Sequence, residues 1–366
     1  MIRNFHSHRP KEAELLTSDK IKNSPVLKSF FSSGISLALA VTFLYIAFYG
    51  VNLSEVMVIV SNASVVWMVV FALTVFLGHV IRALRWKVIL NSVKPNASFK
   101  HLFGALMVGY GVNCVTPKLG EITRAVLLGK WENLSRSSMF GTVIVERVID
   151  IISLGAAVLI SAFIWSASLY ETFPWLEVTL YISALGLFVV LLMIYLSVKF
   201  KEKFYGYFTK FIGKFSQKLA ERLGYIFEML IQGFTSLKGT KNYVLAFITS
   251  VIILLIYALT SYFGFFMLDM QSMYNVTFAM GWILMSISAI GVVIPTPGAT
   301  GSYHALAMST LVLLFGFGEN ISAAFAFLTH IISYFLFIIV ALIMYFALDN
   351  KHSGIFNIFK TNSDDK

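Results

Sequence analysis

Residues 321–348 read ISAAFAFLTHIISYFLFIIVALIMYFAL, an apolar run without a single Asp, Glu, Lys or Arg. About 20 apolar residues let a helix cross the ~30 Å hydrocarbon core of a bilayer, so this run predicts a transmembrane helix. Working outward along the chain, six further runs are long enough to span: Phe30–Tyr49, Ser64–Ile81, Met139–Trp165, Val178–Val198, Tyr243–Phe266 and Val276–Ile294. The sequence therefore predicts an all-α polytopic membrane protein, with a transmembrane domain over residues 30–348.

Composition supports this class and excludes others. Hydrophobic residues make up 58% of the 366 residues and charged residues 13%, against roughly 25% charged in soluble domains. This excludes a disordered chain, a soluble enzyme and a nucleic-acid-binding module with a charged surface. The single cysteine, Cys114, excludes an internal disulfide, and the seven histidines show no metal-ligand spacing. We therefore predict no metal and no cofactor.

Two apolar segments are irregular. His101–Leu128 is interrupted at Thr116-Pro117, where proline lacks an N–H and disfavours helix in the residue before it. Ser302–Phe315 is short and follows a break rich in Pro and Gly. We expect about 7–8 transmembrane helices, eight if Ser302–Phe315 crosses fully, together with broken or re-entrant segments.

The basic residues predict the orientation. The chain has 28 Lys and Arg and a net charge of +10. All but Arg147 fall in the tails 1–29 and 349–366 or in three segments around residues 82–100, 118–136 and 199–241, whereas 50–63, 166–176, 267–275 and 316–320 have none. By the positive-inside rule both termini are cytoplasmic. His101–Arg136 then enters and leaves on the cytoplasmic side as a re-entrant hairpin. Val276–Phe315 begins and ends outside, as two spans or as a hairpin.

Residues 199–241 differ in character from the spans. Aromatic and leucine side chains recur there at three- and four-residue spacing, with lysines mostly between them. This pattern predicts a basic amphipathic helix on the inner leaflet. It fits a linker helix between two halves of the bundle, a segment that recruits anionic lipid, or both.

The first candidate site is the hairpin sequence from Asn113 to Arg124. Lys118, Glu121 and Arg124 follow the Thr-Pro break at three-residue spacing, and Gly120 permits close backbone packing. A lipid phosphate suits Lys118 and Arg124, because arginine can bind phosphate with two hydrogen bonds. The alternative is that Glu121 and Arg124 only pair with each other at the start of a helix.

The second candidate site is Glu146, Arg147 and Asp150, at the start of a span. Glu146 and Asp150 are four residues apart, on one helix face. Ionisable residues inside a span usually face the bundle interior and mark function. The alternative is an ion-pair cluster that clamps helices together, and pairing with the hairpin charges satisfies both interpretations. The Arg82-Ala-Leu-Arg-Trp-Lys87 run instead predicts a juxtamembrane anchor, with Trp86 at the interface.

The third candidate site is Pro295-Thr-Pro-Gly-Ala-Thr-Gly-Ser-Tyr-His304, which contains Pro297, Gly298 and Gly301. This sequence cannot continue a helix, and the N–H groups that begin the next helix can face a phosphate or a carboxylate. His304 lies in that first turn. The alternatives are a plain tight turn and a packing histidine.

At these motifs the sequence resembles the flippase-like integral membrane family of lysylphosphatidylglycerol synthases. The resemblance rests on Arg82–Trp86, on Asn113–Arg124 with its Pro-x-x-Gly-Glu-x-x-Arg core, on Gly141–Asp150 and on Pro295–Gly301, in this order. It implies movement of a polar-headed lipid between leaflets. The chain departs from the family pattern at two positions, with Ala299 at a glycine and His304 at a glutamate.

Fused members of that family carry a soluble domain that transfers an amino acid from tRNA to a lipid. About 18 residues follow the last span here, so we do not expect that activity. We predict a flippase for a phospholipid or an aminoacylated phospholipid in the bacterial cytoplasmic membrane, with membrane lipids as partners and no nucleic acid. The alternatives are a membrane-embedded transferase acting on lipid-linked substrates and a non-transporting partner of a separate lipid-modifying enzyme.

Overall fold

The computed structural model describes residues 25–91, 93–165 and 239–348, together with isolated positions between 181 and 217. The predicted span at 178–198 and the amphipathic helix at 199–241 therefore lie almost entirely outside the described residues, as do most residues of both tails. Everything regular in the described residues is helical. The predicted all-α polytopic class is confirmed.

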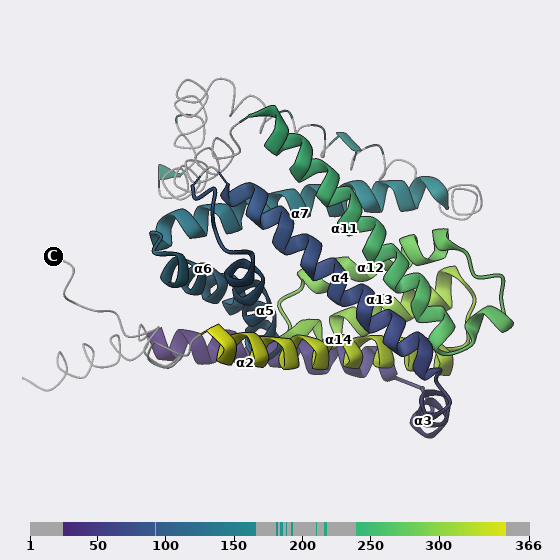
Figure 1. Ribbon diagram of the computed structural model, residues 1–366. Helices are drawn as coiled ribbons and strands as arrows, with labels where there is room; N and C mark the ends of the chain where they lie inside the picture. Colours follow the sequence, from purple (N-terminus) through teal and green to yellow (C-terminus); the bar gives the residue numbers. More distant parts are fainter. Residues whose placement is uncertain are drawn as a thin grey trace, which may run out of the picture.

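The described helices follow the predicted apolar runs (Figure 1). The first group is α2 (Pro25–Phe48), α3 (Leu53–Ser61), α4 (Val65–Leu90), α5 (Phe99–Val115), α6 (Leu119–Glu132) and α7 (Arg136–Ile164). The second is α11 (Thr240–Met267), η1 (Met270–Ser272), α12 (Phe278–Val293), η2 (Pro297–Ala299), α13 (Ser302–Ser309), η3 (Thr310–Leu314) and α14 (Glu319–Leu348).

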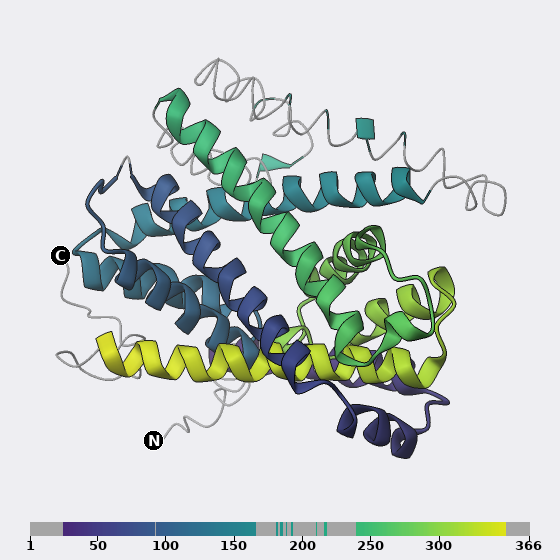
Figure 2. The same ribbon diagram turned by 45° about the vertical axis from the view of Figure 1, so that its right-hand side comes forward.

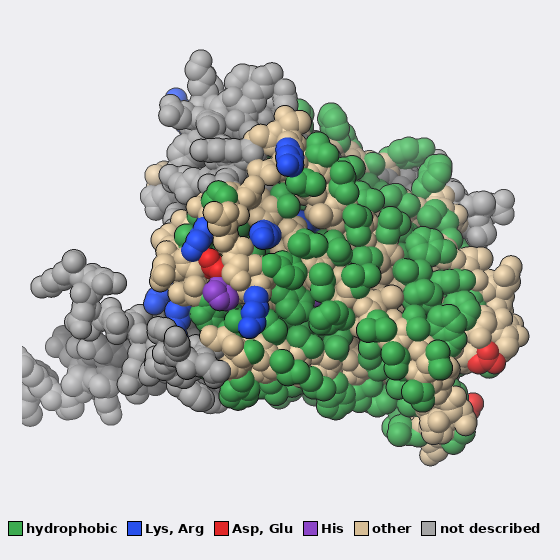
Figure 3. Space-filling model, in the orientation of Figure 1, with side chains coloured by type: hydrophobic (Ala, Val, Ile, Leu, Met, Phe, Trp, Pro, Cys, Tyr) green, Lys and Arg blue, Asp and Glu red, His purple; other side chains and the backbone are tan. Residues whose placement is uncertain are grey.

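Three described helices, α4, α11 and α14, are long and apolar enough to cross a membrane. The pair α2 and α3 adds a fourth if it is one broken span, since its two parts meet at 86°. Large apolar side chains on these helices are exposed, as at Phe247 and Phe346, and Figure 3 shows an apolar surface between two charged ends. Because such surfaces need a lipid environment, they fit a membrane bundle. The count of 7–8 helices stays a prediction.

Both predicted helix breaks occur where the sequence places them. α5 ends at Val115, Lys118 has a left-handed backbone (φ 65°), and α6 begins at Leu119. Asn113 closes this turn, because its Oδ1 accepts a hydrogen bond from the backbone N–H of Gly120 at 2.7 Å. α5 and α6 then pack so closely that a Cβ on Gly120 would collide with the backbone of Gly109.

The second break separates α12 from α13, which has only eight residues and continues as the π-helical turn η3. π-turns are frequent at functional sites. Whether the α5–α6 and α12–α13 pairs are re-entrant stays a prediction.

Among the described residues, two large apolar cores hold the bundle together, beside a small third one around Ala157, Ala258 and Met285. One joins α11, α13 and α14 around Phe265, Phe317 and Phe325. The other joins α4, α5, α6 and α7 around Trp86, Leu106 and other buried apolar side chains. Figure 2 shows α4 and α11 running side by side, as their extensive packing requires. The second core directly supports the charged residues described next.

Candidate functional site

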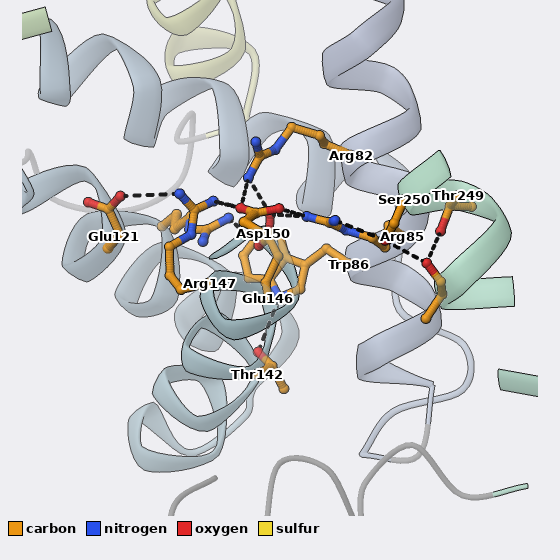
Figure 4. Close-up of polar contacts among 12 residues, drawn as sticks. Arg82, Arg85, Trp86, Glu121, Thr142, Glu146, Arg147, Asp150, Thr249 and Ser250 are labelled. Carbon is orange, nitrogen blue, oxygen red and sulfur yellow. Dashed lines mark hydrogen bonds and ion pairs between the residues drawn. The ribbon is translucent and has the colours of Figure 1, made fainter. Parts of the chain in front are cut away.

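The bundle interior contains a cluster of four arginines and three carboxylates, which we call the arginine cluster (Figure 4). Its members come from three helices: Arg82 and Arg85 from α4, Glu121 and Arg124 from α6, and Glu146, Arg147 and Asp150 from α7. On each helix, members of the cluster lie three or four residues apart, which places them on one face, and on α7 Arg147 also directly follows Glu146. The cluster therefore forms where these three faces meet.

Glu146 lies at the centre of the cluster and has no exposed surface. Its Oε2 accepts a hydrogen bond from Arg124 at 2.5 Å, and its Oε1 accepts one from Arg82 at 2.9 Å. Arg147 and Arg85 also reach Oε1, at 3.3 and 3.4 Å. A buried carboxylate is tolerable only with such pairing, so Glu146 and the arginines depend on one another.

Asp150 completes the inner part of the cluster, one helical turn after Glu146. It accepts hydrogen bonds from Arg82 at 2.6 Å and from Arg85, and it forms an ion pair with Arg147 at 3.0 Å. Arg147 is more exposed than the other three arginines of the cluster, with 36% of its side chain exposed. It reaches Glu121, which is 29% exposed, at 3.8 Å. Access to the cluster is thus from the side of Arg147 and Glu121.

Aromatic and hydroxyl groups surround the guanidinium groups. The guanidinium of Arg124 lies over the Trp86 ring at 5.0 Å, and that of Arg82 lies over the Tyr110 ring at 5.7 Å. Such cation–π contacts strengthen where water is excluded. Trp86 is itself fixed by a hydrogen bond from its Nε1 to Thr142 at 3.1 Å.

Helix α11 also contributes hydroxyl groups that contact the guanidinium groups of the cluster. Arg85 donates to Ser250 at 3.1 Å, and Arg82 donates to Tyr257 at 3.4 Å. A fourth helix therefore holds the two α4 arginines in place.

The cluster carries more positive than negative charge. Four guanidinium groups face three carboxylates, which leaves one positive charge. Four buried guanidinium nitrogens have no hydrogen-bond partner among the described residues: Nε of Arg82, Arg85 and Arg147, and Nη2 of Arg124. An anion could neutralise the excess charge and accept hydrogen bonds from such nitrogens, because guanidinium groups bind phosphates and carboxylates strongly.

The hairpin residues occupy the expected place, with one exception. Asn113 donates to Glu121 at 3.3 Å, and Glu121 and Arg124 pair with Arg147 and Glu146 on α7. The predicted pairing between the hairpin and α7 charges is confirmed, and the alternative that Glu121 and Arg124 pair only with each other is wrong. Lys118 is exposed and makes no ion pair with any described residue.

The interpretation of the Arg82–Lys87 run as a juxtamembrane anchor is wrong. Arg82 and Arg85 are 6% and 1% exposed, and Trp86 is fully buried. α4 extends to Leu90, beyond the apolar run that ends at Ile81, and this extension carries both arginines into the bundle. Their three-residue spacing was the available signal, but their partners lie 61 to 68 residues further along the chain.

The Pro/Gly residues form a separate group. Pro297 and Gly298 lie in η2, Gly301 precedes α13, and His304 lies in its first turn. No hydrogen bond or ion pair links these residues to the arginine cluster within the described part of the chain. Within the same residues, no group of three His, Cys, Asp or Glu side chains is arranged to hold a metal ion.

Apolar spans, exposed apolar side chains and a buried charged cluster together define an integral multi-pass membrane protein. The chain matches the family described as lysylphosphatidylglycerol synthase TM region over residues 33–341. It belongs to that family, as the resemblance of its motifs predicts.

The curated relatives are archaeal UPF0104 membrane proteins. One from Methanocaldococcus jannaschii is 30% identical over 121 residues, 32% of this chain and 36% of that protein. One from Methanothermobacter thermautotrophicus is 34% identical over 92 residues, 24% and 27% of the two chains. One from Pyrococcus horikoshii is 26% identical over 161 residues, 43% and 47%. This chain thus spans less than half the length of each of these relatives. No solved structure matches.

Proposed function

We propose that this protein is a lipid transporter that moves a phosphate-bearing lipid between leaflets, with its headgroup at the arginine cluster. The observation that carries the proposal is the one positive charge in excess, together with the four buried guanidinium nitrogens that lack a partner. A phosphodiester carries one negative charge and several acceptor oxygens. It would neutralise the cluster and pair with these nitrogens.

The carboxylates then have a positioning role. Glu146 and Asp150 hold the four guanidinium groups close together, which like charges would otherwise resist. Glu121 holds Arg147 only loosely, at 3.8 Å and on the half-exposed side. An arriving phosphate can therefore replace Glu121 on Arg147 at small cost. Glu121 is then free to contact a cationic headgroup, such as an aminoacylated one.

The cluster reduces the main barrier to lipid flipping. A charged headgroup is costly in hydrocarbon, and the cost falls when fixed opposite charges replace water around it. Broken helices near a central site are typical of transporters, in which the site opens alternately to the two sides. The break at Pro297–His304 would be the second of these broken-helix elements, beside the α5–α6 hairpin. The family's name, which refers to lysylphosphatidylglycerol, suggests phosphatidylglycerol and its lysyl ester as first substrates.

Reconstitution in liposomes tests the proposal. Fluorescent phosphatidylglycerol, its lysyl ester and a phosphate-free diacylglycerol are compared for protein-dependent exchange between leaflets. We expect exchange of the phosphate-bearing lipids and a loss of about tenfold or more in Arg124→Gln, since one charged hydrogen bond contributes about 1.5–3 kcal/mol. Arg136→Gln is the matched control, because Arg136 is exposed at the start of α7 and outside the cluster. Absence of protein-dependent exchange for every phosphate-bearing lipid would refute the proposal.

A further inference from the structure

The two helix breaks, far apart in sequence, touch each other. The hydroxyl of Tyr334 on α14 donates a hydrogen bond to the carbonyl oxygen of Cys114 at 2.9 Å, at the end of α5. Gly298 lies against both residues, since a Cβ there would be 2.7 Å from the Tyr334 ring and 3.4 Å from Cα of Cys114. Gly298 also has φ 55°, which favours glycine. A movement of one helix break therefore displaces residues at the other break.

A pair of histidines lies beside this contact. His304 on α13 is 3% exposed, and its ring centroid is 4.6 Å from that of His330 on α14. Nδ1 of His304 accepts a hydrogen bond from the backbone N–H of Gly301 at 3.3 Å, so in the neutral ring the proton is on Nε2. Nε2 of His330 lies 3.3 Å from the hydroxyl of Thr300. Ionisable side chains at such depth usually mark function.

The groups around the two rings are neutral. The Tyr303 ring stacks against His330 at 5.8 Å, the Tyr334 ring is tilted against it at 5.6 Å, and Phe48 from α2 lies 5.8 Å from His304. Among the described residues no carboxylate, lysine or arginine contacts either imidazole. A proton that binds there is not neutralised locally, and the nearness of the rings lets one proton bind at a time.

Protonation changes one specific hydrogen bond. A proton on Nδ1 of His304 converts this nitrogen from an acceptor into a donor, so the bond from Gly301 N–H is lost. Gly301 (φ 85°) is the cap of α13 and ends the break that contains Gly298. Gly301 itself packs against α2, so loss of this bond loosens the break at its α2 end, three residues after the Gly298 that touches Cys114.

The hairpin connects this contact with the arginine cluster. Asn113, the residue before Cys114, holds the turn through Gly120 and donates to Glu121. Glu121 in turn reaches Arg147. A continuous set of contacts thus runs from His304 to the side of the cluster on which a headgroup would arrive.

We propose that His304 and His330 form a proton-binding site that couples proton movement to lipid movement at the arginine cluster. The proton binds Nδ1 of His304, displaces Gly301 N–H and shifts the hairpin that carries Glu121. The proposal rests on the proposed transport function and adds its energy source, a proton gradient.

A gradient experiment separates the two proposals. Liposomes containing the protein and a pH-sensitive dye are assayed for lipid exchange at equal pH and under a pH gradient. We expect the gradient to accelerate exchange in the wild type, with proton movement reported by the dye. In His304→Gln we expect the gradient to have no effect, so that the ratio of the exchange rates with and without the gradient falls to about one. His101→Gln, at the opposite end of α5 from the contact, is the control and should respond like the wild type.

The outcomes differ for the two proposals. Absence of exchange under any condition refutes the transport function. Exchange that proceeds at the same rate with and without the gradient refutes only the proton site.

Cys114 gives a second readout that needs no transport, because it is the single cysteine of the chain and lies at the contact between the breaks. Its alkylation by a maleimide in detergent is compared between the wild type and His304→Gln at about pH 8 and about pH 4, because burial without a counter-charge disfavours the protonated ring. We expect the ratio of wild-type to variant rate to rise about fivefold or more on acidification, the lower range of coupling between linked sites. A ratio independent of pH would contradict the proposal.

Discussion

Glu146 is the residue on which the electrostatics of the interior depend most. Four arginines contact its fully buried carboxylate. Removing its charge in Glu146→Gln leaves four guanidinium groups against two carboxylates, and breaking such buried pairing costs about 3–5 kcal/mol. We expect a markedly lower unfolding temperature in detergent. The exposed Glu319→Gln, in the first turn of α14, should cost less than about 1 kcal/mol. Equal effects of both changes would contradict the central role of Glu146.

A second carboxylate, Glu132, predicts a pH dependence of stability. It lies at the C-terminal end of α6, outside the spans, and accepts hydrogen bonds from Ser98 N–H at 3.0 Å and His101 at 2.6 Å, with Lys94 at 2.8 Å. Burial alone would raise the pKa of this carboxyl, but the hydrogen bonds outweigh it, so its pKa lies below the ordinary value of 4.5. Because the pKa of Glu132 is lower in the folded protein than in the unfolded one, its ionised carboxylate stabilises the fold at pH values above the unfolded-state pKa. This stabilisation is lost as the pH falls through the folded-state pKa.

The variant Glu132→Gln tests the direction in which stability changes with pH. The variant should unfold at a lower temperature than the wild type near neutral pH, and the difference should shrink below pH 4.5 as the wild-type carboxyl becomes protonated. Unfolding temperatures measured across this range give the answer. A difference that does not change with pH would show that Glu132 acts through packing alone.

At the scale of elements, the α5–α6 hairpin depends on the absence of side chains where its arms cross. A Cβ on Gly120 would collide with the carbonyl oxygen of Gly109 and with the side chain of Asn113. We expect Gly120→Ala to destabilise the protein by about 1–3 kcal/mol, the usual cost of overpacking. Gly141→Ala is the matched control, because nothing lies within 4 Å of a Cβ there. Within helix α7 it should stabilise by about 0.5–1 kcal/mol. Effects of the same sign would refute the crossing geometry.

The elements also show how far the sequence predicts this structure. The breaks at Thr116-Pro117 and Pro295–Gly301 follow from local chemistry, so they could be predicted. Glu146 and Asp150 sharing a face follows from helical periodicity. The burial of Arg82 does not follow, because an arginine after an apolar run has the same local pattern whether it meets lipid headgroups or carboxylates on another helix. Only the packing of α4 against α7 decides between these two environments.

For the whole molecule, charge is divided between the two ends. Lys94 pairs with Glu132 at the end where α5 begins and α6 stops, and Lys100 and Arg136 are exposed beside them. The opposite end carries carboxylates, with Glu55 and Asp269 lining one cavity there. Figure 3 shows most of the blue side chains at one end, with a red one among them, only red charged side chains at the other end, and an apolar surface between. By the positive-inside rule this division predicts that the Lys94 end is cytoplasmic.

Labelling of introduced cysteines in intact cells tests this orientation. In a Cys114→Ala background, Glu55→Cys should react with a membrane-impermeant maleimide from outside, because Glu55 lies on α3 beyond the bend after α2. Arg136→Cys, exposed at the start of α7, should react only after the cells are opened. The reverse labelling pattern would show that the protein has the opposite orientation in the membrane. The Lys94 end would then lie on the outer side, against the orientation that the division of charge predicts.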